Sequence, residues 1–401
     1  MGLDRRRFTG VRTAGVVLAV AATLTACQTS SSGGGSSTTS AYASTPASQS
    51  VPASSASSPA MAPNACGASE LSKMTLRQKL AQLIAVGVTG TADATQVVQR
   101  EHIGGIFVGS WTDKSILTSG AAARLSRSQP FPLMVTVDQE GGRVSRLSSL
   151  GIDSPSAREL AQTKTPAQVR TFAASIGGQL KRLGITVDFA PDADVSDESA
   201  DEVIGDRSFS NDPQVVTQYA GAFAAGLEDA GIMPVYKHFP GHGHGSGDSH
   251  TGVVRTPPLS SLITSDLVPY KTLLRNPGNA GVMVGHLIVP GLTGPETPSS
   301  ISPRAMTMLR TGKPYGGPAF NGVVFSDDLS GMAAISERYP IEQAALMSIK
   351  AGGDIALWIT TDRVSSVLDS MQSAVTAGTL TQARVDRSVV RILRAKGVLH
   401  C

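Results

Sequence analysis

The sequence predicts an α/β fold of the (β/α)8 or TIM-barrel class, in which eight parallel strands alternate with helices and close into a barrel. Eight short apolar runs alternate with helical patterns from Met74 to the end of the 401-residue chain. Most of these runs lack the polar–apolar alternation of a half-exposed strand, as expected for strands buried on both faces of a parallel sheet. In addition, clusters of polar residues follow directly after the runs, where a barrel carries its functional groups.

The candidate strands are short and apolar, and helical patterns lie between them. In chain order the strands are Ile84–Val88, Gly105–Val108, Leu133–Val137, Ile185–Phe189, Met233–Tyr236, Gly281–Gly285, Val323–Phe325 and Asp354–Trp358. The clearest helical patterns are Leu76–Leu83, Ala167–Leu183, Val215–Ala230, Ile341–Ala351 and Ala383–Lys396. A doubly wound open sheet is the alternative, but no glycine-rich phosphate-binding turn follows an early strand. We therefore expect a single catalytic barrel domain over residues 66–401.

Composition excludes several classes of protein. Hydrophobic residues make up 41% of the chain and charged residues 16%, with a formal net charge of +3. Charge is therefore too sparse and too balanced for a wholly disordered chain or a dedicated nucleic-acid binder. The apolar runs are too short for repeated membrane spans, and three cysteines are too few for a disulfide scaffold.

Residues 1–26 are typical of an export signal. The charged start Arg5-Arg6-Arg7 precedes an apolar stretch, residues 14–24, that is too short to cross a membrane. Leu24-Thr25-Ala26-Cys27 then resembles the cleavage box of a bacterial lipoprotein, so we expect lipid on Cys27, with a short uncleaved anchor as the alternative. The arginines followed by Phe8 also resemble a twin-arginine signal. The signal contains four arginines and one aspartate, so its removal leaves a formally neutral chain.

Residues 27–65 are expected to form a flexible tether behind the lipidated cysteine. Residues 28–63 carry no charge and consist mainly of Ser, Thr, Ala, Gly and Pro, so they bury too little apolar surface to offset the entropy of ordering. This places the barrel in the cell envelope, anchored to the outer face of the cytoplasmic membrane. Cys66 and Cys401 lie at the two ends of the barrel region, which a closed barrel brings together. A disulfide between them is expected, with two free thiols as the alternative.

Polar residues follow the third to the seventh candidate strands. They are Asp138-Gln139-Glu140-Gly141-Gly142-Arg143, then Asp192 and Asp194, then Lys237-His238, then His286, and finally Asp327-Asp328. Because the carboxyl ends of all the strands meet at one face of a barrel, these side chains should converge there. Such a convergence indicates an enzyme.

The densest polar cluster is the glycine-rich segment from Lys237 to His250, which contains four histidines. Its glycines let the chain approach a ligand closely. Asp248 and His250 are two residues apart, so the carboxylate can bind one imidazole nitrogen and tune the ring as a general acid and base.

Two other chemistries are possible for this cluster. His242, His244, Asp248 and His250 could bind a divalent metal, as in a metal-dependent amidohydrolase or deacetylase. However, barrel amidohydrolases usually carry paired histidines after the first strand and an aspartate after the last, and neither feature is present. A serine hydrolase is disfavoured because the segment lacks Gly-x-Ser-x-Gly.

The seventh candidate strand ends in a pair of carboxylates, Asp327 and Asp328. Neighbouring residues on an extended chain point to opposite sides, so both should not be catalytic. One can face the barrel mouth as a nucleophile while the other makes structural hydrogen bonds, and Asp328 could serve as a helix cap.

These motifs together resemble glycoside hydrolase family 3, and within it the bacterial β-N-acetylglucosaminidases. The matching segments are Met74–Leu76, Val137–Val144, Ile204–Phe209, Lys237–Gly243, Asp248–His250 and Ser326–Leu329. They span nearly all of the barrel region, and Lys-His-Phe-Pro-Gly-His-Gly followed by Asp-Ser-His is the most specific part. Because the chain ends soon after Ala383–Lys396, it resembles the single-domain form of the family.

The resemblance implies a role for each matching residue. Asp327 would be the nucleophile that forms a covalent glycosyl-enzyme, and His250 the acid/base, oriented by Asp248. The hydroxyls of N-acetylglucosamine would be bound by Asp138, Arg146, Arg207, Lys237 and His238. Most retaining glycosidases use a second carboxylate where this subgroup uses a histidine. No cofactor and no metal are implied.

The predicted location in the cell envelope, together with the implied specificity for N-acetylglucosamine, predicts peptidoglycan fragments such as GlcNAc-MurNAc as the saccharide partner. We expect a monomer that contacts the membrane through the lipid on Cys27 and binds no nucleic acid. A lipoprotein that merely binds wall glycans is an alternative, but it would not need Asp327 or the Asp248/His250 pair. Phosphorolysis in place of hydrolysis is a second alternative.

Overall fold

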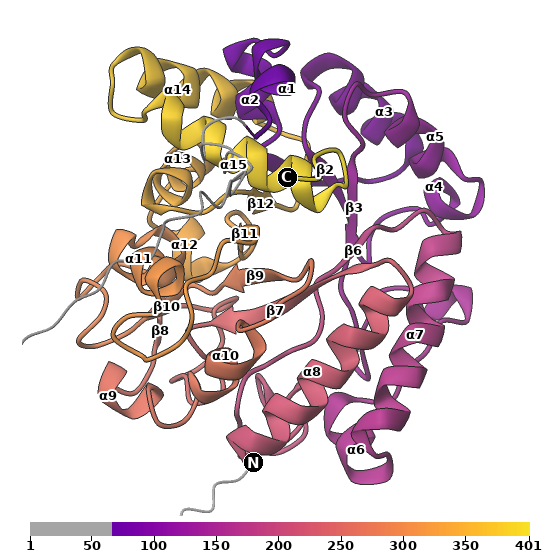
Figure 1. The fold of residues 1–401 in the computed structure, drawn as a ribbon, viewed down its shortest axis with the longest axis vertical. Helices are drawn as coiled ribbons and strands as arrows, with labels where there is room; N and C mark the ends of the chain where they lie inside the picture. Colours follow the sequence, from indigo (N-terminus) through magenta and orange to yellow (C-terminus); the bar gives the residue numbers. More distant parts are fainter. Residues whose placement is uncertain (1–65) are drawn as a thin grey trace, which may run out of the picture. The chain divides into compact units, whose positions relative to one another are not determined.

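The chain folds into the predicted (β/α)8 barrel in a computed structural model that describes residues 66–401 (Figure 1). Eight parallel strands are hydrogen-bonded in the order β11-β9-β7-β6-β3-β2-β1-β12. They are β1 (Ile84–Gly87), β2 (Gly105–Val108), β3 (Met134–Val137), β6 (Val187–Asp188), β7 (Met233–Phe239), β9 (Gly281–Val284), β11 (Val324–Ser326) and β12 (Ala356–Trp358). A parallel bridge between Phe325 and Ile355 connects the two ends of this order and closes the barrel. All eight predicted strands are confirmed.

Strand β7 differs from its predicted bounds because it extends three residues beyond Tyr236. The apolar run stops at Tyr236, yet the backbone of Lys237 accepts a hydrogen bond from Ala193 N–H, and Phe239 pairs with Val284 of β9. Lys237 and His238 are therefore part of the strand itself rather than of the following loop. The strand was predicted from its apolar run, and the polar side chains of Lys237 and His238 ended that run before the strand itself ends.

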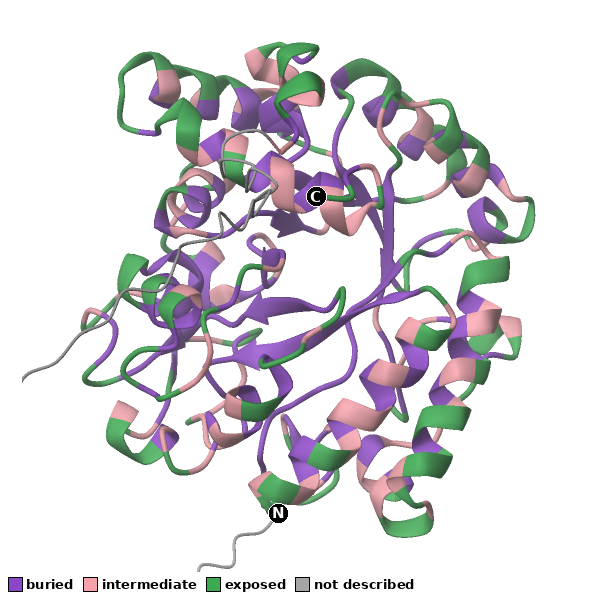
Figure 2. Ribbon diagram, viewed as in Figure 1, coloured by how far each residue is buried: buried purple, intermediate pink, exposed green. Residues whose placement is uncertain are grey.

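Helices surround the barrel, with their buried faces toward the strands and their exposed faces outward (Figure 2). They are α1 (Ala68–Ser72), α2 (Leu76–Ala81), α3 (Thr91–Glu101), α4 (Ser115–Thr118), α5 (Ala121–Arg127), α6 (Ala157–Thr163), α7 (Pro166–Arg182), α8 (Pro213–Asp229), α9 (Leu259–Leu262), α10 (Val268–Leu273), α11 (Pro303–Thr311), α12 (Ala333–Ser336), α13 (Ile341–Ala351), α14 (Val364–Thr376) and α15 (Gln382–Ala395). Helix α7 begins at Pro166, one residue before the predicted start, because Thr165 and Gln168 form a capping box around its first turn.

Two small additional sheets belong to the loops that follow the barrel strands. Strands β4 (Gln139–Gly141) and β5 (Val144–Ser145) form an antiparallel hairpin directly after β3. Strands β8 (Val254–Arg255) and β10 (Leu287–Ile288) pair in parallel and connect the loops after β7 and β9. They give fixed positions to chain segments that would otherwise be long irregular loops.

Aromatic side chains fill the middle of the barrel. The rings of Phe107 and Phe189 lie 5.9 Å apart between centroids, and Phe189 meets Phe325 edge to face at 5.3 Å. These residues come from β2, the end of β6 and β11, so the contacts cross the barrel interior. Such pairs stabilise a core beyond the area that they bury, and here they form an apolar layer beneath the carboxyl ends of the strands.

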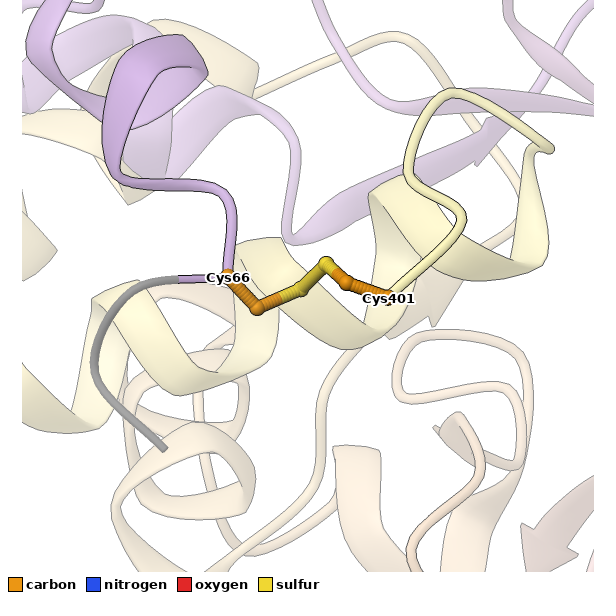
Figure 3. Close-up of a disulfide and its surroundings, with 2 residues drawn as sticks. All are labelled: Cys66 and Cys401. Atoms are coloured by element: carbon orange, nitrogen blue, oxygen red, sulfur yellow. A yellow bond between two sulfur atoms is a disulfide. The ribbon is translucent and has the colours of Figure 1, made fainter. Parts of the chain in front are cut away.

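A disulfide joins Cys66 and Cys401, whose Cα atoms are 5.9 Å apart (Figure 3). It connects the chain just before α1 to Cys401, which lies six positions after the end of α15. Cys27, the expected signal and the expected tether lie outside the described residues. Within residues 66–401, no helix combines the length and the apolar character needed to cross a bilayer.

Replacing Cys401 with serine should lower the free energy of unfolding by about 2–4 kcal/mol, because a crosslink restricts the unfolded chain and this one joins residues 335 apart. Denaturant unfolding under oxidising conditions measures the effect. Cys66→Ser should lose the same amount, and the double variant no more than either single variant. Additive losses would show that the two cysteines contribute separately.

Candidate active site

A cleft of about 580 Å³ opens at the carboxyl ends of the barrel strands. Every residue predicted to be catalytic or sugar-binding lines it, namely Asp138, Arg146, Arg207, Lys237, His238, Asp248, His250 and Asp327. Phe107 and Phe189 of the aromatic layer belong to its apolar lining. The structure thus brings together residues from four strand ends that are up to 189 positions apart in the chain.

A chain of buried ion pairs forms the polar end of the cleft. Lys237 Nζ lies 2.7 Å from Asp138 Oδ1 and 2.5 Å from Glu140 Oε1. The same Glu140 carboxylate accepts two hydrogen bonds of 2.9 Å from the guanidinium of Arg207. Glu140 therefore lies between two cations, one on β7 and one on the loop after β6.

The charges in this network persist across the ordinary pH range. Burial alone would raise the pKa of Glu140, but Arg207 and Lys237 lower it well below its usual value. Burial likewise disfavours the charged form of Lys237, yet Asp138 and Glu140 raise the pKa of its ammonium above the usual value. A polar ligand that binds here would meet ionised donors and acceptors whose positions are already set.

His238 is held as a neutral ring of one tautomer. Burial lowers its pKa to about 4, against the opposing effect of Asp192. Its Nδ1 lies 2.7 Å from Asp194 Oδ2, so Nδ1–H donates to that carboxylate. Nε2 is then the acceptor that faces Arg207, with Nη2 3.4 Å away.

Two carboxyl groups behind His238 share this buried environment. Burial and the charge of Asp194 raise the pKa of Asp192 well above its usual value, and burial raises the pKa of Asp194 to about 6. Asp194 also accepts the backbone N–H of His242 at 2.6 Å, which fixes the turn after β7. The pair therefore keeps one proton and one negative charge near neutral pH, opposite Arg207.

The loop that carries Arg207 is clamped by side chains from neighbouring segments. Arg143 donates to the carbonyl oxygens of residues 201–204 and pairs with Asp206, with Nε 3.2 Å from Oδ1. From inside the loop, Glu198 accepts the backbone N–H groups of Ile204 and Gly205. Arg207 is thus presented by a rigid loop that has no regular strand or long helix.

The carboxylates of Asp327 and Asp328 make different contacts. Both carboxylate oxygens of Asp328 accept hydrogen bonds from the turn that follows, including the backbone N–H groups of Ser330 and Gly331 at 2.9 Å. Asp327 is buried at the inner end of the cleft, where its Oδ1 accepts the N–H of Asp328. Burial raises the pKa of Asp327, but the nearby imidazoles of His238 and His286, this hydrogen bond and the ammonium of Lys237 lower it below its usual value.

His286, which follows β9, supports the same turn from behind. Its Nε2 donates to the carbonyl oxygen of Asp328 at 2.7 Å, and its Nδ1 accepts from the hydroxyl of Ser300 at 2.7 Å. The sequence singled out His286 as a candidate site residue because it follows a predicted strand. It positions the backbone next to Asp327 rather than lining the cleft.

Asp248 and His250 form the expected pair on the loop after β7. His250 Nδ1 and its backbone N–H lie 2.7 and 2.9 Å from Asp248 Oδ1, and the imidazole is 59% exposed. Burial opposes ionisation of Asp248, but the two hydrogen bonds from His250 lower the pKa of the carboxyl. Nδ1 is therefore the donor to Asp248, and Nε2 is left for the cleft.

The loop that carries this pair is hydrogen-bonded to the segment that follows Asp327 in the chain. The N–H of Ala334, in α12, donates to the carbonyl oxygen of Ser249 at 3.0 Å, and Ala333 N–H donates to that of His250 at 3.4 Å. The Ser249 hydroxyl also contacts Met332 Sδ at 3.6 Å. Because α12 follows the Asp327 turn directly, these bonds couple the position of His250 to the segment that holds Asp327.

The four residues considered for a metal site do not form a ligand group within residues 66–401. His244 pairs instead with Asp266, its Nδ1 lying 2.9 Å from Oδ2, and His250 pairs with Asp248. The ligand-type atoms of Asp192, Asp194 and His238 do lie within 4.8 Å of one another and could hold a cation. Arg207, 3.5 Å from Asp192, already provides positive charge at that place.

Sequence reasoning did not assign site roles to Glu140, Asp194 and Arg143. Each lies in a strand-end segment that the sequence singled out, so the signal was present in their position. Their functions depend on distances between loops, because Glu140 bridges two cations and Arg143 clamps a loop about 60 residues further along. Arg146 differs from the other predicted sugar-binding residues, since its side chain makes no hydrogen bond within residues 66–401.

Comparison with known proteins gives a consistent result. Residues 75–395 match the family described as glycosyl hydrolase family 3 N terminal domain. The chain is 58% identical over 322 residues to the beta-hexosaminidase LpqI of Mycobacterium tuberculosis, which covers 80% of this chain and 82% of that protein.

Two solved structures are similar as well. A glycosyl hydrolase of the GH3 family from Mycobacterium smegmatis is 56% identical with a TM-score of 0.80, covering 82% of this chain and 99% of that one. A glycoside hydrolase family 3 beta-N-acetylglucosaminidase from a Paenibacillus species is 30% identical with a TM-score of 0.74, covering 81% of this chain and 62% of that one.

The pKa values of His238 and His242 should lie far below that of His244. Burial lowers the pKa of both His238 and His242 to about 4, whereas the hydrogen bond to Asp266 raises the pKa of His244 above its usual value. In a ¹⁵N NMR titration, the first two rings should therefore stay neutral as the pH falls until about 4, while His244 is protonated first. Asp266→Asn should abolish the upward shift of His244 and leave His238 unchanged. Titration of His238 near pH 6.5 would contradict the buried Nδ1–H tautomer.

Proposed function

The chain belongs to glycoside hydrolase family 3, and on this basis we propose that it is a retaining, exo-acting β-N-acetylglucosaminidase that releases N-acetylglucosamine from peptidoglycan fragments. The resemblance seen in the sequence is thereby confirmed at the level of the family. The observation that carries the proposal is the convergence of Asp327 and the Asp248/His250 pair on one cleft with an ionised polar end. Beta-hexosaminidase and beta-N-acetylglucosaminidase are the activities named for the relatives.

Glycosylation is the first step of the proposed mechanism. His250 Nε2 gives its proton to the glycosidic oxygen while Asp327 attacks the anomeric carbon from the opposite face. The bond from that carbon to the leaving oxygen breaks as the bond to the Asp327 carboxylate forms, through an oxocarbenium-like transition state. The lowered pKa of Asp327 supports this role, because a nucleophile must be ionised.

Deglycosylation reverses the proton movement. His250 Nε2 removes a proton from water, the water oxygen bonds to the anomeric carbon, and the bond to Asp327 breaks. Two inversions give net retention. Asp248 orients His250 throughout by accepting its Nδ1–H, which stabilises the imidazolium formed in this step.

Sugar binding is assigned to the ionised end of the cleft. Asp138 and Lys237 offer an acceptor and a donor 2.7 Å apart, which suits a hydroxyl that donates to one and accepts from the other. Arg207 and His238 provide further donors and acceptors on the same side, and Arg146 has a side chain with no competing partner among residues 66–401. A site that encloses one terminal sugar in this way favours exo-cleavage.

Our proposal that peptidoglycan fragments are the natural substrate, and the cell envelope the location, is based on the N-terminal residues. The Leu24–Cys27 sequence and the uncharged segment after it support a lipid-anchored enzyme of the cell envelope, where GlcNAc-MurNAc fragments are available. Family membership favours this activity over the metal-dependent amidohydrolase and over a lipoprotein that only binds glycans.

Incubation of the purified protein with the GlcNAc-MurNAc disaccharide tests the function directly. Free N-acetylglucosamine should appear as the β-anomer first, at the same rate with and without phosphate, and Asp327→Ala should release none while its thermal unfolding stays cooperative. Product analysis by NMR distinguishes the anomers. A sugar phosphate as product would favour phosphorolysis, and near-normal cleavage of an aryl N-acetylglucosaminide by Asp327→Ala would refute the nucleophile.

The dyad is tested by the dependence on the leaving group. His250→Ala should lower kcat/KM for the disaccharide by about 10²–10⁴-fold, since a sugar leaves poorly without a proton. The loss should be much smaller for a dinitrophenyl glycoside, which leaves without protonation. Asp248→Asn should reproduce this pattern more weakly, because it removes only the orientation of the ring. Equal losses for both leaving groups would argue against acid catalysis by His250.

A further inference from the structure

Trp111 is an unusual side chain in a chain with only two tryptophans. It lies on the loop between β2 and α4 and lines the cleft, and it is 45% exposed. Trp358, the other tryptophan, is buried in β12. Among the described residues, Val253 is the other large hydrophobic residue with comparable exposure, and it does not line the cleft.

One side of the Trp111 indole is packed against its own loop. A Cβ atom at Gly109 would lie 2.4 Å from the indole ring, so the glycine lets the ring rest on the backbone there. Phe107 meets the indole edge to face, with centroids 5.9 Å apart and an interplanar angle of 61°. The ring keeps an exposed surface that lines the cleft.

The loop that carries Trp111 is held rigidly. Lys114 Nζ donates to the carbonyl oxygens of Gly109, Ser110 and Thr112 at 2.7, 3.2 and 2.8 Å. The buried Thr112 hydroxyl donates to Val88 O at 2.6 Å and accepts the N–H of Gly109 at 3.0 Å. The indole is therefore held in place before any ligand binds, which lowers the entropy cost of a stacking contact.

We propose that Trp111 forms the subsite for the sugar on the leaving-group side of the cleaved bond, where its exposed indole surface stacks on the apolar face of an N-acetylated pyranose. The inference rests on the proposed function and specifies its substrate class as an oligosaccharide rather than a glycoside of any small alcohol. The terminal sugar is assigned to the polar end of the cleft, where Asp138 and Lys237 lie. An exposed aromatic ring at the rim of the same cleft suits the next sugar, which extends toward solvent.

Two substrates distinguish stacking of Trp111 on the second sugar from a general effect of the substitution on activity. The GlcNAc-MurNAc disaccharide offers a second ring for stacking, whereas methyl N-acetyl-β-glucosaminide has an equally poor leaving group that is too small to stack. Trp111→Ala should lower kcat/KM for the disaccharide about tenfold, mainly through KM, and leave that for the methyl glycoside within about twofold. Trp111→Phe should retain most of the activity on the disaccharide.

Val253→Ala serves as the matched control, because Val253 is as exposed as Trp111 but lies outside the cleft, and it should change neither substrate. Equal losses on both substrates in Trp111→Ala, or no loss on either, would overturn the subsite. If the wild-type protein cleaved neither substrate, the proposed function itself would have failed, and the subsite with it. Wild-type cleavage of both with no difference in the variant would refute the subsite alone.

Discussion

The contact on which the candidate site depends is the pairing of Glu140 with Lys237 and Arg207. Taking such charges out of water costs several kcal/mol for each ion, and the cost is offset only when every partner is present in good geometry. Glu140 meets this condition by accepting from both cations, while Asp138 takes a second bond from Lys237. Because the segments that follow β3 and β6 and strand β7 itself each contribute a member, the network fixes their relative positions as well as its own charges.

The proposed nucleophile, Asp327, and the proposed acid/base, His250, lie in two contrasting environments. Asp327 is enclosed at the end of a barrel strand, and its neighbour Asp328 is fully used by the following turn. His250 is mostly exposed on a loop, as suits a group that must reach both a leaving oxygen and incoming water. The hydrogen bonds from Ala333 and Ala334 to this loop join the two environments, so the more exposed partner is positioned by the segment that follows the buried one.

The barrel could be predicted from the sequence because each of its strands is recognisable from a short run of neighbouring residues. A strand buried on both faces must be apolar throughout, and eight such runs identify the fold without any long-range information. The pattern failed at Lys237 and His238, where functional side chains stand on the strand itself and interrupt its apolar run. It also could not assign Glu140 or Arg143, because the need for a bridging carboxylate or a loop clamp exists only once distant loops are side by side. Motif resemblance identified residues that line one cleft, but not those that hold them in position.

The cleft offers different contacts at its two ends, and this matches the chemistry of a carbohydrate. A pyranose has hydroxyl edges, which need donors and acceptors, and apolar faces, which need an aromatic or aliphatic surface. At the inner end, the pKa values of Lys237 and Glu140 are moved away from neutrality, so the groups that would contact hydroxyls keep their charges when pH changes. At the rim, Trp111 offers apolar area that does not depend on charge at all. Aromatic residues form only 4% of the chain, and in the proposed complex one well-held indole would meet the second sugar ring while ionic groups would hold the first.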